Sequence, residues 1–363
     1  MKVLLLANNE YTIYGFRREL VDKLLELGYE THISFPIGEY TPYFLEKGCK
    51  IHDLSISQHG MNPVKDITLV FQYIRLIKKV KPDFVLTYTI KPNVYGGFAC
   101  GLLKKHFAAT ITGLGAAFEK NGLMTRLALF LYKIGLRKTD KVFFQNKSHS
   151  ELFNKNNIAK DKHQLVSGSG VNLDIHAFEE YPKDDKTSFL FVGRVMKDKG
   201  IYELVEAFKN KLKNNSNIEL KVVGPASEKD ETNIKELEKQ GILTYYGKQS
   251  DVHKFMKDAH VIILPSYHEG MANVLLEAGA CGRPVIASDI PGCSEAFKEG
   301  WNGFGVEPQN VDSLTTAIDK FLDLSYEQKK EMGVNARKKI ENEFDRNIVV
   351  DTYINTINKY ANK

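Results

Sequence analysis

The sequence lacks an apolar run long enough to cross a lipid bilayer. A spanning helix needs about 18 apolar residues, whereas the densest apolar run here covers only residues 127–132. The apolar residues that follow Lys2 are too few for a secretory signal and lack a small-residue cleavage pattern. We therefore expect a buried first strand at the N-terminus and a cytoplasmic protein whose contact with the inner face of the cell membrane is peripheral.

The sequence is also poor in the groups that build disulfide frameworks and metal centres. Its four cysteines form no Cys-x-x-Cys pair and have no flanking histidine cluster, so we expect a reducing compartment and no bound metal. No fixed-period repeat and no nucleic-acid-binding motif occurs, which excludes a solenoid and disfavours nucleic acid as a partner. A dinucleotide fingerprint is incomplete, because Phe118 stands where the third glycine is needed after Gly113 and Gly115.

Acidic residues are scarce in one region of the chain. Residues 68–141 hold 13 lysines and arginines against 3 acids, although the net charge of all 363 residues is only +5. A region with such an excess of positive charge favours an anionic partner. The length exceeds the usual size of a single core and predicts two domains.

Short apolar runs alternate with helix-period segments through the whole chain. This alternation predicts parallel sheets covered by helices on both faces. The pattern restarts after the polar stretch 179–188, which reads as a linker. We therefore predict an α/β protein with one Rossmann-like domain at 1–180 and a second at 187–345. A final helix with an apolar stripe is expected to return residues 346–363 to the first domain.

Two glutamates eight residues apart give the strongest local signal. Glu269 precedes a glycine and is expected on a loop, while Glu277 is expected in the second turn of the helix that follows. Backbone amides at the start of that helix, residues 270–273, are expected to be unpaired and to favour an anion. A sugar diphosphate, with many hydroxyls and two phosphates, suits such a site.

A second signal lies at residues 193–200, where the first strand of the second half ends. Arg194 and Lys199 can converge there on one diphosphate, the arginine as a planar fork and the lysine as a mobile charge. Taken alone, the segment is more often two solvated cations in a turn. The glutamate-containing loop is what favours the diphosphate.

With these motifs in place, the chain resembles the family 4 retaining glycosyltransferases of the GT-B fold, two Rossmann-like domains facing across a cleft. The resemblance rests on residues 193–200, 269–277, 282–289 with the Pro291-Gly292 and Glu295 that follow, and 302–304. The first half, through 87–93 and 112–115, resembles a subgroup that builds bacterial lipid-linked oligosaccharides and capsular or O-antigen repeats.

The resemblance implies roles for individual residues. Glu269 would hold the hydroxyls of the donor sugar, Glu277 would bind the ribose diol, and Arg194 and Lys199 would neutralise the departing diphosphate. No Asp-x-Asp metal motif occurs, so these cations would replace a metal and no cofactor is expected beyond the donor substrate. The remaining residues assigned to donor binding are Gly193, Gly224, Lys248, Gly270, Met271, Ala272, Asn273 and Val274.

The sequence departs from the family pattern in two places of the first half. Relatives often carry a Gly-Gly pair in the first loop, where this chain has residues 8–11, Asn-Asn-Glu-Tyr. Relatives also often place a histidine after the fourth strand, where this chain has Lys91. Lys91 is either a catalytic cation for a phosphate or an ordinary loop lysine, and the sequence leaves both readings open.

The basic region contains an amphipathic segment at 122–138. Its apolar stripe is expected to pack in the core, as most such stripes do, with the cations on its solvated face. The excess of cations instead favours docking on anionic lipid of the inner leaflet. The proposed membrane-facing cations are Arg126, Lys133 and Arg137 of this segment and Arg75, Lys78 and Lys79 of the helix before it.

These expectations combine into one leading function. The chain would move an N-acetylhexosamine or a hexose, with retention, from a UDP-sugar to a saccharide on polyprenyl diphosphate during surface glycan synthesis. Two alternatives stay open: a non-catalytic subunit that binds nucleotide sugar or membrane, and a transferase that uses a GDP-sugar or a soluble acceptor. The sequence does not indicate the oligomeric state.

Overall fold

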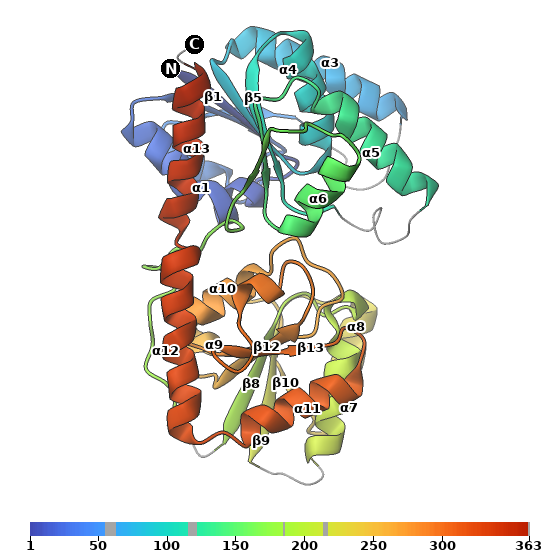
Figure 1. Ribbon diagram of the computed structural model, residues 1–363, viewed down its shortest axis with the longest axis vertical. Helices are drawn as coiled ribbons and strands as arrows, with labels where there is room; N and C mark the ends of the chain where they lie inside the picture. The colour runs from blue at the N-terminus through green and yellow to red at the C-terminus, as the bar shows by residue number, and fades with distance from the viewer. Residues whose placement is uncertain (55–62, 115–121, 184–185, 213–216, 362–363) are drawn as a thin grey trace. The chain divides into compact units, whose positions relative to one another are not determined.

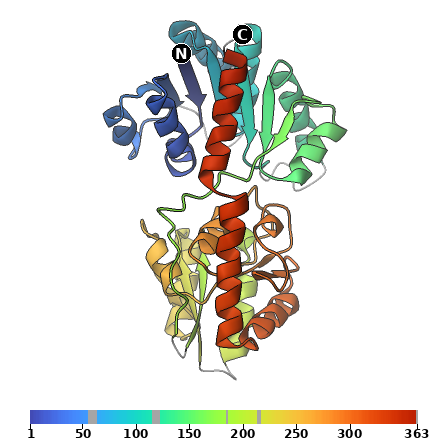
Figure 2. The same cartoon turned by 60° about the vertical axis from the view of Figure 1, so that its left-hand side comes forward.

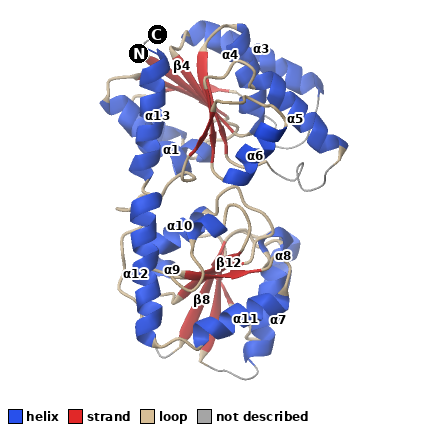
Figure 3. Cartoon of the chain, viewed as in Figure 1, coloured by secondary structure: helices blue, strands red, loops and turns tan. Residues whose placement is uncertain are grey.

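The computed structural model describes residues 1–54, 63–114, 122–183, 186–212 and 217–361, and it divides into two compact units (Figure 1). Unit 1 comprises Met1–Ser169 and Arg346–Lys363, and unit 2 comprises Gly170–Asp345. Each unit has its own parallel sheet with helices on both faces (Figure 3). The predicted α/β class with two Rossmann-like domains is confirmed.

Unit 1 has a seven-stranded sheet in the order β3-β2-β1-β4-β5-β6-β7. Its central strands are apolar and buried on both faces, as in β1, where Val3 to Leu6 are fully buried. The strands are β1 (Lys2–Leu6), β2 (Glu30–Phe35), β3 (Lys50–Asp53), β4 (Phe84–Tyr88), β5 (His106–Ile111), β6 (Lys141–Phe144) and β7 (His163–Leu165).

The helices of unit 1 form two layers because strand side chains alternate between the faces of the sheet. Val3 and Leu5 pack with the core that includes α1 and α13, and Leu4 and Leu6 pack with the core that includes α3 and α4. The helices are α1 (Tyr11–Glu26), α2 (Thr41–Glu46), α3 (Pro63–Val80), the π-helical turn η1 (Pro92–Gly96), α4 (Gly97–Leu102), α5 (Leu123–Gly135), α6 (Lys147–Lys155) and α13 (Arg346–Ala361).

The final helix, α13, packs on the sheet of unit 1 (Figure 2). Its Tyr353 is fully buried, and its ring lies 4.5 Å from that of Phe143. At the start of the helix, Arg346 forms an ion pair with Glu19 of α1 at 2.8 Å. The apolar stripe read from the sequence therefore belongs to the core of unit 1.

Unit 2 has a six-stranded sheet in the order β10-β9-β8-β11-β12-β13. Its strands are β8 (Thr187–Val192), β9 (Ile218–Val223), β10 (Thr244–Tyr245), β11 (Val261–Leu264), β12 (Val285–Ser288) and β13 (Gly303–Val306). Its helices are the short η3 (Lys197–Lys199) and η4 (Ser294–Ala296) with α7 (Ile201–Leu212), α8 (Glu228–Lys239), α9 (His253–Lys257), α10 (Asn273–Ala280), α11 (Val311–Leu322) and α12 (Tyr326–Glu343).

The boundary between the units lies earlier than residues 180–187, where the sequence placed it. The segment from Gly170 onward packs on unit 2 because its backbone carbonyls meet the fully buried Arg283. That guanidinium donates to the carbonyls of Glu179 and Glu180 at 2.9 Å each, and the Tyr181 hydroxyl donates to His260 O at 2.9 Å. The sequence predicted a linker at this polar stretch, but its backbone carbonyls accept hydrogen bonds from the buried Arg283 side chain.

Candidate functional site

The candidate site of unit 2 lies where its strand order reverses. β8 has β9 on one side and β11 on the other, so the loops that follow β8 and β11 are neighbours at the carboxyl ends of the strands. Ligands of open α/β sheets bind at this kind of position. Lys199 follows β8 and Glu269 follows β11, so both lie on these two loops.

The two loops are joined by an ion pair. The Lys199 ammonium contacts Glu269 Oε1, and the Ser266 hydroxyl donates to the same oxygen at 2.8 Å. The side chains of Lys199 and Glu269 are 19% and 13% exposed, so the pair is largely shielded from water. The backbone amide of Tyr267 donates to Asp198 O at 2.9 Å, which is a second link between the same two loops. The structure thus brings together Lys199 and Glu269, two of the predicted site residues, and Ser266 is a member that the sequence did not single out. The predicted convergence of Arg194 with Lys199 on one diphosphate stays a prediction.

Glycines allow this close approach. Gly200 has φ +69°, and a Cβ there would lie 2.0 Å from the Pro265 carbonyl oxygen. Gly224 has φ +146°, and its Cβ would lie 1.8 Å from the Gly193 carbonyl oxygen. Only glycine fits these positions without moving the backbone, so the loop carrying Lys199 is held against its neighbours by main-chain packing.

The other predicted donor-binding residues surround this loop. Arg194 is exposed, and within the described part of the chain no ion pair or hydrogen bond holds its side chain. Lys248 is exposed just after Gly247, whose carbonyl accepts from the Gly224 amide at 2.8 Å. Arg194 and Lys248 therefore extend from loops whose backbones are held by hydrogen bonds of Gly193, Gly224 and Gly247.

The helix α10 carries the second glutamate as the sequence predicted. Glu277 lies in the second turn of α10, and Glu269 precedes the helix. One expectation is wrong: the Ala272 amide is not available to an anion, because it donates to Gly292 O at 2.7 Å. Met271 and Ala272 are buried, whereas Gly270, Asn273 and Val274 are half-buried. The start of α10 is therefore partly used by the chain itself.

Lys91 does not stand as a free cation in unit 1. Its ammonium lies 3.0 Å from Asp66 Oδ1, and the two side chains are 13% and 9% exposed. Asp66 lies in the first turn of α3, which precedes β4 in the chain. The sequence alone did not pair it with Lys91. Burial, together with the nearby Asp66 carboxylate, raises the pKa of Tyr95. The structure favours the ordinary structural reading of Lys91.

Replacing Lys91 with methionine is expected to lower the free energy of unfolding by about 3 kcal/mol, because Asp66 then keeps a buried charge without its partner. The double variant Lys91→Met, Asp66→Asn is expected to recover most of that loss. Urea unfolding measures both. A single variant that loses turnover at unchanged stability would instead assign Lys91 to catalysis.

The first loop of unit 1 is occupied by its own side chains. Asn9 Oδ1 accepts from the Thr12 amide at 2.9 Å and caps the start of α1. Glu10 Oε2 accepts from the Tyr40 amide at 3.0 Å and from the Thr41 hydroxyl at 2.9 Å. A carboxylate at this point repels a phosphate, so this loop is poorly suited to bind one.

One group of side chains has donor atoms that suit a metal. Ligand atoms of His176, His253 and Cys281 lie within 4.8 Å of one another. His253 already pairs with Cys281 at 3.1 Å and with Glu179 at 3.0 Å, and burial raises the pKa of the Cys281 thiol to about 12. Because His253 and Cys281 already pair with each other, and His253 also pairs with Glu179, we assign no metal to the group. The sequence missed the cluster because its members lie far apart along the chain.

The basic region of unit 1 differs from its expected form. All six predicted membrane-facing cations, Arg75, Lys78, Lys79, Arg126, Lys133 and Arg137, are exposed. The expectation that the apolar stripe of α5 lies in the core is wrong: the buried face of α5 consists of Thr125, Ala128, Tyr132 and Gly135. Exposed instead are Leu123 at 83%, Met124 at 50%, Leu127 at 42%, Phe130 at 58% and Ile134 at 40%.

Further exposed apolar side chains lie on neighbouring helices. Ile67 and Phe71 of α3 are 59% and 65% exposed, and Phe98 and Leu102 of α4 are 40% and 60% exposed. A group of exposed apolar side chains beside cations is typical of a surface that binds something else. Within the described ranges, no helix combines the length and the apolar character needed to span a bilayer.

Comparison with known proteins identifies two family patterns in the chain. The family described as Glycosyl transferase 4-like matches residues 2–146, and the family Glycosyl transferases group 1 matches residues 174–339. The first match falls in unit 1 and the second in unit 2. The second contains both Lys199 and Glu269.

Individual relatives match over most of their length. One is the N,N'-diacetylbacillosaminyl-diphospho-undecaprenol alpha-1,3-N-acetylgalactosaminyltransferase of Campylobacter jejuni, 26% identical, covering 98% of this chain and 97% of the relative. Another is the UDP-Gal:alpha-D-GlcNAc-diphosphoundecaprenol alpha-1,3-galactosyltransferase of Escherichia coli, 26% identical, covering 78% and 76%. A glycosyltransferase structure from Rickettsia africae superposes with a TM-score of 0.81 at 21% identity, covering 99% and 98% of the two chains. The chain therefore belongs to the glycosyltransferases of the group 1 and 4-like families and has their two-unit GT-B fold.

Proposed function

We propose that this glycosyltransferase moves a sugar from a UDP-sugar, with retention at the anomeric carbon, to a saccharide carried on polyprenyl diphosphate. The observation that supports the donor site best is the shielded Lys199–Glu269 pair at the strand-order reversal of unit 2. The acceptor is inferred from the two relatives above, whose names specify undecaprenol-diphosphate saccharides. The E. coli name also specifies a UDP-sugar.

The ion pair explains how the site is ordered before the donor arrives. Lys199 and Glu269 hold each other in place without ligand, and Ser266 shares the carboxylate. When donor binds, Lys199 exchanges the carboxylate for a phosphate oxygen, and Glu269 accepts from sugar hydroxyls. Lys199 then contacts the diphosphate and Glu269 contacts the sugar, the two groups that the breaking bond joins. Such preorganised charges stabilise a transition state because they need little rearrangement during the reaction.

The proposed reaction balances without a metal. The anomeric carbon–oxygen bond to the diphosphate breaks, and the bonding electrons leave with the diphosphate. Lys199 and the exposed Arg194 offset the charge that develops there. The acceptor hydroxyl attacks from the same face, and its proton passes to a phosphate oxygen of the departing UDP. Glu277 on α10 binds the ribose diol and holds the nucleotide in position.

The acceptor is membrane-bound, and the protein docks on that membrane with the exposed surface of α3 and α5. Replacing Arg126, Lys133 and Arg137 together with glutamate is expected to abolish sedimentation with anionic liposomes, because each cation near the surface contributes about 1 kcal/mol. The matched control replaces the exposed Lys229, Lys239 and Lys254 of unit 2, with the same change in charge. Equal binding by both triple variants would contradict the docking face.

The function is tested by product mass. The protein is incubated with a panel of nucleotide sugars and a short-chain lipid-diphosphate saccharide, and the lipid product is weighed by mass spectrometry. We expect a gain of one hexose or N-acetylhexosamine from a UDP-sugar only. Gain from a GDP-sugar alone would correct the donor, and turnover with a free saccharide but not with the lipid-linked one would overturn the proposed acceptor.

A further inference from the structure

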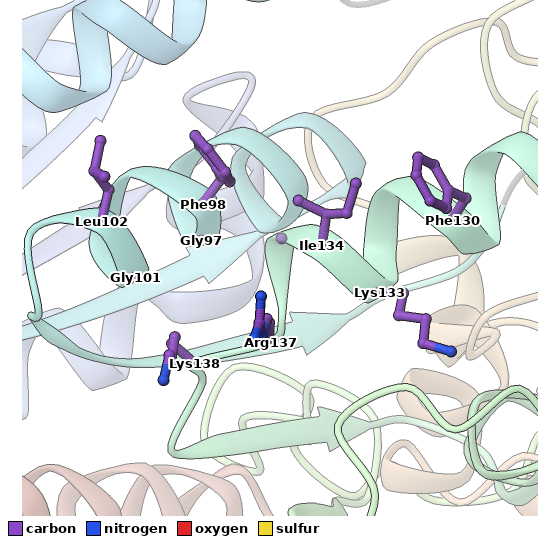
Figure 4. A pocket seen from close by; sticks show the side chains of 10 residues that line it. Gly97, Phe98, Gly101, Leu102, Phe130, Lys133, Ile134, Arg137 and Lys138 are labelled. Atoms are coloured by element: carbon purple, nitrogen blue, oxygen red, sulfur yellow. The ribbon is translucent and has the colours of Figure 1, made fainter.

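A groove crosses the exposed apolar surface of unit 1 between α4 and α5 (Figure 4). Its volume is about 470 Å³, which is within the usual range for small-molecule sites. It exists because α4 and α5 approach closely at glycines: a Cβ on Gly97 would lie 2.7 Å from the Gly135 carbonyl oxygen. With no side chains at these positions, the larger neighbours border an open channel.

The border of the groove is apolar on both helices. Phe98 and Leu102 come from α4, Phe130 and Ile134 come from α5, and the four project to the same side in Figure 4. Each is at least 40% exposed. An apolar ligand that covers this exposed hydrocarbon stabilises the complex by roughly 25 cal/mol per Å² of apolar surface removed from water. The border therefore suits a hydrocarbon chain.

Three cations lie at the same groove. Lys133, Arg137 and Lys138 line it, all three are exposed, and within the described residues no carboxylate pairs with them. Figure 4 shows Arg137 and Lys138 on the side opposite the apolar side chains. Three unpaired cations beside one apolar channel match a single chain that ends in a diphosphate better than a phospholipid, which carries two chains and one phosphodiester charge.

We infer that the α4–α5 groove binds the first isoprene units of the lipid acceptor, with its diphosphate on Lys133, Arg137 and Lys138. The inference rests on the proposed function, since it names the part of unit 1 that recognises the lipid of the acceptor. The protein thus binds the lipid anchor directly and does not depend on the bilayer alone to present it.

The test uses farnesyl diphosphate, an isoprenoid diphosphate soluble enough to be titrated below its micellar concentration. Calorimetric titration of the full chain is expected to give saturable binding at one site. Inorganic diphosphate and farnesol, each carrying half of the ligand chemistry, are expected to bind at least about tenfold more weakly, because each loses either the apolar or the ionic contribution. Equal affinity for inorganic diphosphate would overturn the groove as a lipid site.

A variant that fills the groove separates it from the general membrane face. Gly101 lines the groove, and a Cβ there would lie 3.2 Å from Cβ of Lys138, so Gly101→Leu occupies the channel without changing any charge. Farnesyl diphosphate affinity is expected to fall by about tenfold, with the melting temperature checked as a fold control. The matched variant Phe71→Ser removes exposed hydrocarbon from α3, outside the groove, and is expected to leave that affinity unchanged.

Three outcomes would contradict the inference. They are unchanged affinity in a folded Gly101→Leu protein, equal loss in Phe71→Ser, and displacement of farnesyl diphosphate by phosphatidylglycerol vesicles as readily as by geranylgeranyl diphosphate. The last would assign the surface to bulk phospholipid. No donor sugar is present in these titrations. Loss of UDP-sugar turnover with intact farnesyl diphosphate binding would therefore refute only the donor assignment, and the reverse result would refute only the groove.

Discussion

Replacing Lys199 with alanine is expected to lower kcat for sugar transfer by about 10² to 10³-fold, the range found when one preorganised charge or donor is removed from a developing anion. The structure places this ammonium against Glu269 in a shielded position, so its charge is not screened by bulk water. The effect is expected mainly in kcat, because the charge on the leaving diphosphate grows as the bond breaks. Turnover of UDP-sugar to UDP at saturating donor measures it.

Three further variants separate chemistry from folding. Lys199→Arg keeps the charge but changes its geometry, and we expect partial activity. The double variant Lys199→Ala, Glu269→Gln removes both charges. We expect it to recover the stability that Lys199→Ala alone loses, but not the activity. Lys209→Ala, on a lysine of α7 whose side chain is 38% exposed, is the matched surface control. If Lys199→Ala and Glu269→Ala both turn over at the parent rate, the site assignment is wrong.

The sequence was sufficient for the fold and for placing Lys199 and Glu269 at the same end of the sheet, for a common reason. Strands such as β1 and β8 are apolar on both faces, which is typical of a covered parallel sheet. Motifs that follow adjacent parallel strands end at the same edge, so the positions of Lys199 and Glu269 could be inferred from their place after the strands. Neither inference depends on the exact side-chain packing.

Other features depended on contacts between distant residues, and local patterns do not encode these. The partner of Lys91 is Asp66, which lies 25 residues earlier in the chain. The Ala272 amide donates to the carbonyl of Gly292, which lies on the loop after β12. The apolar stripe of α5 gave the correct periodicity but the wrong face, because small residues such as Ala128 and Gly135 lie on the buried face, where Gly135 approaches Val94 of η1 and Gly97 of α4. Periodicity reports an apolar face without telling whether the protein core or another partner covers it.

Replacing Gly200 with alanine is expected to reduce the free energy of unfolding of unit 2 by about 3 kcal/mol and to reduce turnover with it. Part of the loss is the strain of a left-handed backbone at φ +69°. The larger part is steric, because the added Cβ would lie 2.0 Å from the Pro265 carbonyl oxygen. The loop that carries Lys199 must then move away from the loop that carries Glu269.

Gly241→Ala is the matched control for this prediction. Gly241 lies in the same unit with nearly the same backbone, φ +72°, but nothing lies within 4 Å of its added Cβ. Alanine there is expected to cost about 1 kcal/mol, the strain alone, and to leave turnover unchanged. Urea unfolding and UDP-sugar turnover of the two variants give the difference. Equal losses in both would mean that main-chain packing at Gly200 does not position Lys199, whereas a loss of activity confined to Gly200→Ala would show that this packing holds Lys199 in the geometry that turnover requires.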